Sequence, residues 1–177
     1  MVVIDKKELR KEVRAKLHAM TTEAKDVASC AIVSSVREHI VVSGAKVVAL
    51  FSPLHDEPQI WPLVEKLAER VVVVLPRIEG DVMNFYCIGK MEAGAYSIME
   101  PQNTSCVSPG EIDVMIVPGV AFTLSGKRMG RGKGFYDKYM SHKDFRALKI
   151  GVCYSVQIVD DIPCEEHDIA MDAVICK

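Results

Sequence analysis

The sequence predicts an α/β fold in which helices cover both faces of a mostly parallel sheet. Continuous runs of apolar side chains, such as residues 71–75 and 114–117, are typical of strands that are buried on both faces. Amphipathic stretches with a helical period separate several of these runs, and strands that alternate with helices form parallel sheets. With 177 residues the chain is long enough for a substantial core, and we expect a single domain over residues 1–177.

Composition and charge are those of an ordinary globular protein. Hydrophobic residues make up 49% of the chain, charged residues 26%, and the formal net charge is -2. This balance gives no general attraction to nucleic acid or membranes, so any basic site must be local. The apolar runs are too short to span a bilayer, and the N-terminus lacks the core of a signal peptide. We therefore expect a cytoplasmic protein without a nucleic-acid or membrane partner.

The six cysteines are scattered, without a CxxC pair or the spacing of zinc ligands. Several lie in apolar segments of the chain. We interpret them as buried free thiols in a reducing compartment, and we expect no zinc site.

Residues 5–20 are expected to form the first helix, with Asp5 as its N-cap. One side of this helix carries an apolar stripe of Leu9, Val13 and Leu17. Lys6 and Arg10 fall beside the stripe. Their cationic groups either reach an anion inside the protein or lie along the apolar surface with their charges in water.

A second helix is expected over residues 22–43, and Gly44 is suited to end it. Its inner side is expected to carry Val27, Ala31, Val36 and Ile40. Residues 46–52 then form a buried strand.

Three polar residues, His55, Asp56 and Glu57, follow directly after this strand. Ligands of open α/β sheets bind outside the carboxyl ends of the strands, so these side chains are candidates for a binding site. Alternatively, Asp56 or Glu57 caps a helix that begins with Pro58. The residues alone do not decide between these interpretations.

The remaining elements alternate along the chain. We expect a helix over 59–70, a strand over 71–75 that Pro76 ends, a strand over 82–88, irregular structure over 90–110, a strand over 114–117, a helix over 135–142, and strands over 148–154 and 173–176. If the strands before them run parallel, the loops at 53–58 and 118–136 lie at the same edge of the sheet.

The stretch from Gly126 to Asp137, which we call the glycine loop, carries the clearest functional signal. It contains four glycines, four cationic side chains, two aromatic residues and one carboxylate. Glycines let a backbone approach a ligand closely, and exposed N–H groups surrounded by Lys and Arg bind phosphate. Asp137 is well placed for a metal ion that bridges phosphate oxygens. The loop matches neither the P-loop nor the dinucleotide fingerprint, yet it indicates a nucleotide polyphosphate site.

Residues 118–122 and the glycine loop together closely resemble the signature of the 5-formyltetrahydrofolate cyclo-ligase family, also called 5,10-methenyltetrahydrofolate synthetases. Further matches to that family, in the same order, are residues 6–10, 56–57, and 166–168 with Asp172. The resemblance implies a three-layer α/β fold similar to that of sugar-phosphate isomerases and CoA transferases. It also implies the ATP- and Mg²⁺-dependent conversion of 5-formyltetrahydrofolate to 5,10-methenyltetrahydrofolate, with release of ADP and phosphate. The formyl oxygen would be phosphorylated, and N10 of the folate would then close the ring.

The resemblance also assigns roles to residues. ATP would be bound by Lys6, Lys7, Glu8, Leu9, Arg10, Arg128, Met129, Gly130, Arg131, Gly132, Lys133, Gly134, Phe135 and Tyr136. The folate would contact Arg10, Ser52, Glu57, Arg131, Gly132, Lys133, Gly134 and Phe135, with Glu57 suited to the N–H groups of the pterin. Arg131 and Lys133 would be the catalytic residues that stabilise the transferring phosphoryl group, and Asp137 and Asp168 would hold Mg²⁺. We expect a monomer whose partners are these small molecules.

Two positions depart from the family pattern, since Thr123 stands where many relatives carry Asp and Phe135 stands where Tyr is usual. Phe135 keeps a stacking surface but lacks a hydroxyl donor. His167 either orients Asp168 or is an ordinary histidine. Two other functions stay open. A sugar-phosphate isomerase or another phosphotransferase would need neither the cationic first helix nor Asp137, and an RNA-binding module would use the Gly-Arg-Gly-Lys-Gly sequence of the loop.

Overall fold

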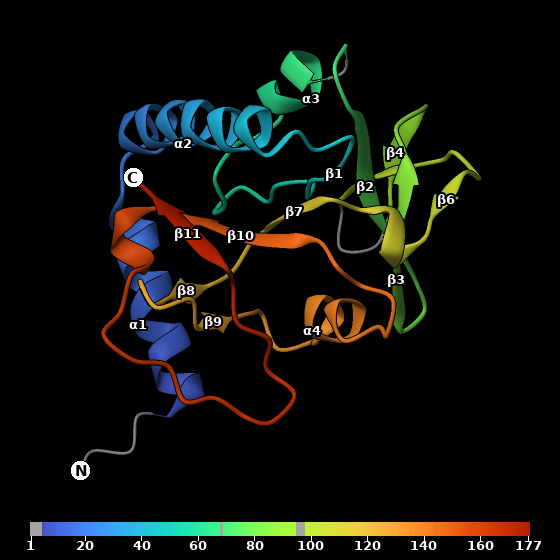
Figure 1. Cartoon of the computed structure of the whole chain (residues 1–177). Helices are drawn as coiled ribbons and strands as arrows, with labels where there is room; N and C mark the ends of the chain where they lie inside the picture. The colour runs from blue at the N-terminus through green and yellow to red at the C-terminus, as the bar shows by residue number, and fades with distance from the viewer. Residues whose placement is uncertain (1–4, 68, 95–97) are drawn as a thin grey trace.

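The computed structural model describes residues 5–67, 69–94 and 98–177. At its centre lies a seven-stranded sheet with the strand order β11-β10-β7-β1-β2-β3-β6 (Figure 1). The strands are β1 (Val47–Ala49), β2 (Val72–Glu79), β3 (Val82–Cys87), β6 (Cys106–Val107), β7 (Val114–Val117), β10 (Leu148–Cys153) and β11 (Ala173–Cys176). The strands from β11 to β2 run parallel, and β3 and β6 are added antiparallel. The predicted α/β fold with a mostly parallel sheet is confirmed.

Helices cover both faces of the sheet, with α2 and α3 above it and α4 below it in Figure 1. The helices are α1 (Lys6–Ala19), α2 (Thr22–Ser43), α3 (Pro62–Leu67) and α4 (Phe135–Met140), with the short 3-10 helices η2 (Pro109–Glu111) and η3 (Ser155–Gln157). The first three helices share one apolar cluster with Val48, Ile116 and Ile150. α4 packs in a second cluster with Ala49 and Met115. Adjacent strand residues thus point into opposite layers, which gives the three-layer architecture.

The ends of the first two helices follow from their sequence. The carboxylate of Asp5 caps α1 by accepting a hydrogen bond from the backbone N–H of Lys7 at 3.1 Å. Gly44 ends α2 in the left-handed conformation, with φ of 69°. The predicted inner side of α2 is wrong at Val27, which is 72% exposed. The buried face is centred one residue later, on Ile32 and its neighbours at four-residue spacing.

Three further local predictions are wrong. β2 continues through Pro76, which costs no hydrogen bond with β1 because β1 pairs with β2 only as far as Val74. α3 is shorter than predicted and begins at Pro62, because proline fits the first turn of a helix but not its interior. Residues 90–110 are not irregular throughout. They contain β4 (Met91–Ala93) and β5 (Met99–Pro101), which form an antiparallel ribbon, and β6.

The cysteines are free thiols, but the prediction that they are buried is wrong for half of them. Cys153 is buried, whereas Cys30, Cys106 and Cys164 are exposed. Apolar neighbours in the sequence do not fix which face a side chain takes in a helix or strand. Within the described ranges, no helix combines the length and the apolar character needed to cross a membrane.

Two central strands bring the candidate site together. β1 and β7 are parallel neighbours, so the loops at 53–58 and 118–136 leave the same edge of the sheet, as predicted. After β7, the short strands β8 (Ala121–Phe122) and β9 (Arg128–Met129) form a hairpin. Gly126 lies at its turn with φ of 97°, and a side chain there would strike the backbone oxygen of Met171. This hairpin holds the start of the glycine loop beside the sheet edge.

Candidate active site

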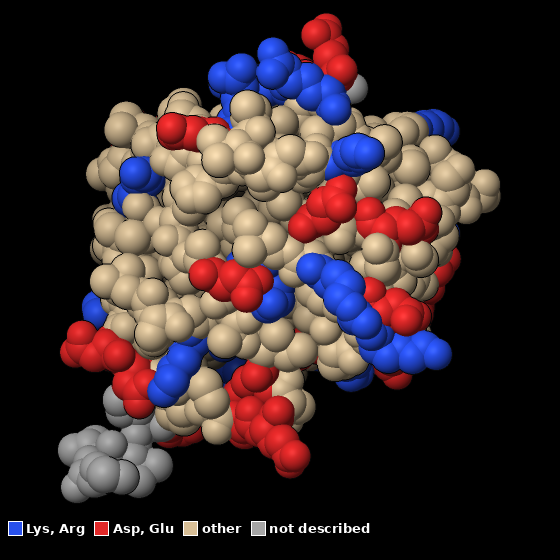
Figure 2. Space-filling model, viewed as in Figure 1, with Lys and Arg blue, Asp and Glu red and all other residues tan. Residues whose placement is uncertain are grey.

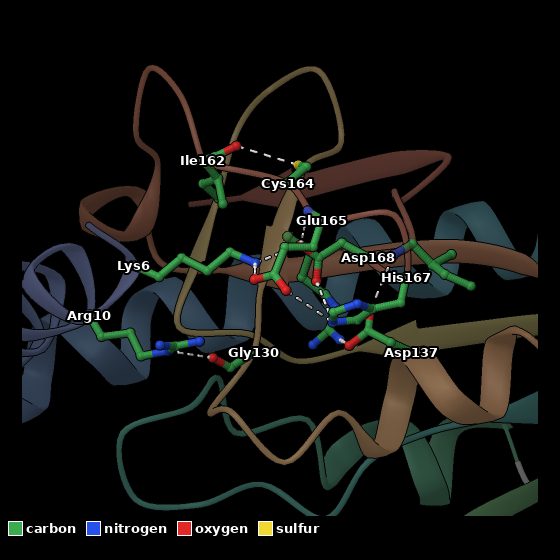
Figure 3. Close-up of polar contacts among 11 residues, drawn as sticks. Lys6, Arg10, Gly130, Asp137, Ile162, Cys164, Glu165, His167 and Asp168 are labelled. Atoms are coloured by element: carbon green, nitrogen blue, oxygen red, sulfur yellow. Dashed lines mark hydrogen bonds and ion pairs between the residues drawn. The ribbon is translucent and has the colours of Figure 1, made fainter. Parts of the chain in front are cut away.

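A cavity of about 850 Å³ lies at this edge of the sheet. Its lining comes from the start of α1, the segments after β1 and β7, the glycine loop, β2, β3, β5 and residues 165–168. In Figure 3, Lys6 and Arg10 extend from α1 toward Asp168 and Gly130, respectively. The volume is near the upper end of the range for small-molecule sites, roughly 300–1,000 Å³. The cavity is therefore large enough for a small-molecule ligand.

Charged side chains of both signs are gathered inside this cavity. Its cationic lining residues are Lys6, Lys7, Arg10, Arg128, Arg131 and Lys133, and its acidic lining residues are Asp5, Glu57, Glu100, Asp137, Glu165 and Asp168. On the face of the described residues shown in Figure 2, basic and acidic side chains are interspersed, and no broad area carries positive charge alone. Cations that are confined to a concave site and interspersed with carboxylates suit a small ligand better than an extended nucleic-acid backbone.

Arg10 ties the first helix to the glycine loop. Its Nε donates a hydrogen bond to the carbonyl oxygen of Gly130 at 3.0 Å (Figure 3). Within the loop, Gly132 and Gly134 have φ angles of 104° and 68°, a region that residues with side chains rarely adopt. Of the two interpretations of the α1 cations, the structure shows the inward one, since both Lys6 and Arg10 contact residues of the cavity wall.

Arg131 joins the glycine loop to the segment after β1. Its Nε donates to Oε1 of Glu57 at 3.1 Å, and its terminal nitrogen donates to Oδ1 of Asp56 at 2.5 Å. Glu57 is 5% exposed, and burial raises its pKa although the Leu54 backbone N–H and Arg131 both act to lower it. The alternative in which Asp56 or Glu57 caps the next helix is wrong, because α3 begins at Pro62. These carboxylates instead position Arg131.

The two predicted magnesium ligands lie close together. Oδ2 of Asp137 accepts a hydrogen bond from Arg128 at 2.7 Å, and Oδ1 accepts one at 3.2 Å from the backbone N–H of Ile169, the residue after Asp168. Oδ2 of Asp168 accepts from Lys6 at 2.7 Å (Figure 3). Within the described residues, no group of three or more His, Cys, Asp or Glu side chains could hold a metal by itself. Two carboxylates fit Mg²⁺, which protein sites commonly bind through one or two carboxylates together with substrate phosphates and water.

We expect the ion pair between Lys6 and Asp168 to stabilise the fold by an amount that depends on pH. Burial raises the pKa of Asp168, but hydrogen bonds from Lys6 and from the backbone N–H of Glu165 outweigh it and hold the pKa below the ordinary value of 3.8. A carboxyl group whose pKa is lower in the folded protein than in the unfolded chain stabilises the fold at pH values above the unfolded pKa. This stabilisation is lost as the pH falls through the folded pKa. We expect Asp168→Asn to lower the free energy of unfolding by about 1 kcal/mol at neutral pH.

Urea unfolding across a pH series measures this effect. The difference between wild type and Asp168→Asn should disappear as the pH falls below 3.8. Glu12→Gln, which breaks an exposed pair with Lys16, is the matched control and should stay close to wild type throughout. A deficit of Asp168→Asn that is equal at every pH would contradict the ion-pair explanation.

The other predicted binding residues divide into two groups. Ser52, Phe135 and Tyr136 line the cavity, whereas Glu8 is exposed outside it and Leu9 and Met129 are buried in the apolar core. The hydroxyl of Ser52 donates to the carbonyl oxygen of Met99 at 2.5 Å. A role of Glu8, Leu9 or Met129 in binding ATP stays a prediction that their side-chain positions do not favour.

Three residues that the sequence left open have distinct places. Thr123 is buried in the β8–β9 turn, where its hydroxyl oxygen accepts from the backbone N–H of Lys127 at 3.0 Å, so this departure from the family pattern lies away from the cavity. The side chain of His167 lines the cavity but is 70% exposed, and its Nε2 is 3.9 Å from Oδ1 of Asp168. That separation is too long for a hydrogen bond. His55 is exposed and does not line the cavity.

Several lining residues were missed by the sequence reasoning. They are Asp5, Phe51, Leu54, Pro76, Ile78, Met83, Ile98, Glu100, Pro118, Gly119 and Glu165. Most flank a predicted element, so the rule that ligands lie beyond strand ends could have found Phe51 and Pro118. No sequence pattern points to Glu100, because it lies in residues 90–110, which lack the pattern of a helix or a strand.

A comparison with known protein families shows to which family this chain belongs. The sequence model of the 5-formyltetrahydrofolate cyclo-ligase family matches residues 2–177. The chain belongs to this family. Its resemblance to the family, first read from the glycine loop and the matching segments, is thereby confirmed across its length.

Named relatives agree with this membership. The chain is 34% identical over 145 residues to a 5-formyltetrahydrofolate cyclo-ligase of Mycolicibacterium smegmatis, covering 76% of this chain and 74% of the relative. It is 23% identical over 187 residues to the 5-formyltetrahydrofolate cyclo-ligase of Mus musculus, covering 96% and 92%.

Solved structures extend the likeness to the fold. The chain superposes on the 5,10-methenyltetrahydrofolate synthetase of Aquifex aeolicus with a TM-score of 0.86 at 34% identity, covering 97% of this chain and 89% of the other. For the 5,10-methenyltetrahydrofolate synthetase of Mycoplasma pneumoniae the TM-score is 0.81 at 27% identity, with 97% and 98% covered. The three-layer architecture is therefore the one found in this family.

Proposed function

We propose that this chain catalyses the ATP- and Mg²⁺-dependent conversion of 5-formyltetrahydrofolate to 5,10-methenyltetrahydrofolate, with release of ADP and phosphate. The observation that carries the proposal is a cavity that is lined both by the cationic glycine loop and by apolar residues of β2 and β3. A polyphosphate needs the first kind of surface, and a flat bicyclic ring needs the second. The names of the relatives support the same reaction.

The chemistry requires activation of the formyl group. A formamide carbonyl is a poor electrophile, so ring closure needs its oxygen to become a good leaving group. Transfer of the γ-phosphoryl group breaks the bond to ADP and forms an O–P bond at the formyl oxygen, which leaves an iminium phosphate. N10 then attacks the formyl carbon and loses its proton, and phosphate departs with the oxygen. The protein mainly has to position the two substrates and balance their charge.

The lining residues supply these functions. Lys6, Lys7, Arg10 and Arg128 offer cationic groups for the ATP phosphates. Arg131 and Lys133 stand on the part of the glycine loop where the two substrates would meet, and we assign them to the transferring phosphoryl group. Ser52, Glu57 and Phe135 lie on the side that would take the folate. Since one chain provides all of these walls, we also propose that it acts as a monomer.

Asp137 and Asp168 are the residues that would hold Mg²⁺. Both line the cavity, and each carboxylate now faces a cation, Arg128 or Lys6. The ion would neutralise the charge of the phosphates beside Asp137 and Asp168. Before binding, Arg128 and Lys6 keep the two carboxylates in place and their charges balanced.

A direct assay tests the proposal. Purified protein, 5-formyltetrahydrofolate and MgATP should give the near-ultraviolet absorbance of a methenyl-folate product together with an equal amount of ADP, and a chelator should abolish both signals. Absence of product from the wild-type protein would overturn the assignment. ADP formation with a phosphosugar in place of the folate would favour another phosphotransferase, and salt-sensitive RNA binding would favour an RNA-binding module.

A further inference from the structure

Glu100 is a buried carboxylate on the wall of the cavity. It lies on β5, in the β4–β5 ribbon, and is 4% exposed. Arg77 of β2 donates from one terminal nitrogen to the carbonyl oxygens of Pro101 at 3.3 Å and Asn103 at 3.1 Å, so the chain around Glu100 is fixed to the central sheet. The side chain of Glu100 therefore has a defined place, although its segment carried no signal in the sequence.

Its two oxygens have different surroundings. Oε1 accepts a hydrogen bond from the backbone N–H of Ile78 at 3.1 Å. Oε2 lies beside the α-carbon of Gly94, where any side chain would collide with it, and has no hydrogen-bond partner among the described residues. A carboxylate can accept hydrogen bonds at about four lone-pair sites, and the N–H of Ile78 uses one of them, so Glu100 can accept further hydrogen bonds from a ligand in the cavity.

Apolar side chains contribute to the cavity that Glu100 lines. They are Phe51, Pro76, Ile78, Met83 and Ile98, and the backbone of Ile78 is bonded to Glu100. Burying a carboxylate among such side chains is costly unless a donor compensates it. ATP phosphates cannot provide this compensation, because they are acceptors and carry the same charge sign. A ligand with N–H donors on the edge of a flat, weakly polar ring can provide it.

We propose that Glu100 is a specificity-determining residue for the folate, whose bicyclic ring donates N–H groups to the Glu100 carboxylate. This inference rests on the proposed function and extends it. The assigned folate contact Glu57 already accepts from Arg131 and from the backbone N–H of Leu54. Glu100 adds an acceptor on the ribbon side of the cavity, and it excludes phosphate there by charge. The two substrates are thereby directed to different walls.

Glu100→Gln separates this role from a structural one. Glutamine keeps an acceptor for the N–H of Ile78 but replaces the charged acceptor Oε2 by a donor. Calorimetric titration with 5-formyltetrahydrofolate without ATP should show a Kd raised about tenfold or more, as expected for loss of a hydrogen bond to a charged group. The KM for the folate should rise in parallel, while the KM for ATP and the melting temperature stay unchanged.

Two further variants sharpen the result. Glu92→Gln changes the cross-strand neighbour of Glu100, which is exposed and pairs with Lys90, and it should bind the folate like wild type. Gly94→Ala keeps the charge of Glu100 but forces its carboxylate to move, and it should weaken folate binding in the same direction as Glu100→Gln.

The outcomes distinguish this inference from the proposed function. An unchanged folate Kd in Glu100→Gln, with an active wild type, would overturn the inference alone. Equal increases in the KM values for folate and ATP, or a lower melting temperature, would assign Glu100 a structural role and overturn it as well. A wild-type protein that binds no folate would overturn both proposals.

Discussion

Arg131→Ala should lower kcat/KM for the cyclo-ligase reaction by about three orders of magnitude while the protein still folds. The guanidinium of Arg131 is half-exposed in the cavity and is held by Asp56 and Glu57, so its direction is fixed before substrates bind. A positioned cation at a transferring phosphoryl group acts mostly on the transition state. The loss should therefore appear in kcat more than in the KM for either substrate. Steady-state kinetics with the methenyl-folate assay measures the effect.

Two further variants show whether the loss of activity in Arg131→Ala comes from the lost charge or from the lost geometry of the guanidinium. Arg131→Lys keeps the charge but cannot reach Glu57 and Asp56 with two nitrogens, so it should recover only part of the activity. Lys138→Ala removes an exposed cation from α4 and should behave like wild type. Arg131→Ala with more than a tenth of the wild-type kcat/KM would remove Arg131 from the catalytic residues.

Removal of Arg131 should also cost stability in a way that depends on pH. Burial already raises the pKa of Glu57, and Arg131 is one of the groups that lower it. Without Arg131 the pKa of Glu57 should rise further, because a buried charge loses its partner. When the pKa of Glu57 is higher in the folded protein than in the unfolded chain, the free energy of unfolding is lowered at pH values above the folded pKa. This loss disappears as the pH falls and Glu57 becomes protonated. Thermal unfolding of Arg131→Ala at acidic and neutral pH separates this loss from catalysis.

The buried parallel strands were predictable because their environment demands one kind of residue. β7 has apolar layers on both faces, so each of its four residues is apolar and buried. Strands of this kind leave a continuous run in the sequence. Once β1 and β7 were expected to be parallel, the loops after them had to share an edge, and the Arg131–Glu57 contact follows from that placement.

The β4–β5 ribbon could not be predicted in the same way. Each strand has three residues, and Glu92 and Glu100 face each other in the ladder, so neither a run nor an alternation of apolar residues appears. Packing of the ribbon against β2 buries Glu100 and leaves Glu92 exposed. This difference depends on contacts between segments that are distant in sequence, and the pattern of either strand alone does not contain it.

The ion pair between Asp137 and Arg128 could not be predicted from the sequence either. Its position at the end of a cationic loop indicated a metal ligand, which stays a prediction. The structure adds that Arg128, nine residues earlier, already balances its charge. This pairing arises because the β8–β9 hairpin turns Arg128 toward the start of α4, and turns of this kind leave no periodic pattern.

Arg128→Met should lower the free energy of unfolding by about 3–5 kcal/mol, the largest effect on stability expected among the cavity residues. The Arg128 side chain is 3% exposed and donates to the carbonyl oxygen of Pro118 at 3.1 Å as well as to Asp137. Methionine fills part of the volume but leaves a half-buried carboxylate with one hydrogen bond, from the backbone N–H of Ile169. Urea denaturation at neutral pH measures the loss.

A double-mutant cycle shows how much of this loss belongs to the ion pair. In Arg128→Met with Asp137→Asn, no uncompensated charge is left at the buried position, so the double variant should be more stable than the sum of the single losses predicts, by about 0.5–3 kcal/mol. Arg146→Met, an exposed arginine that bonds to carbonyl oxygens near its own position, is the control and should be nearly neutral. Additive losses in the cycle would mean that Arg128 stabilises the hairpin through Pro118 and its packing. In that case the hydrogen bond between Arg128 and Asp137 would contribute little to stability. If the losses are not additive, the guanidinium of Arg128 stabilises the fold through the carboxylate of Asp137, the residue that we propose as a magnesium ligand.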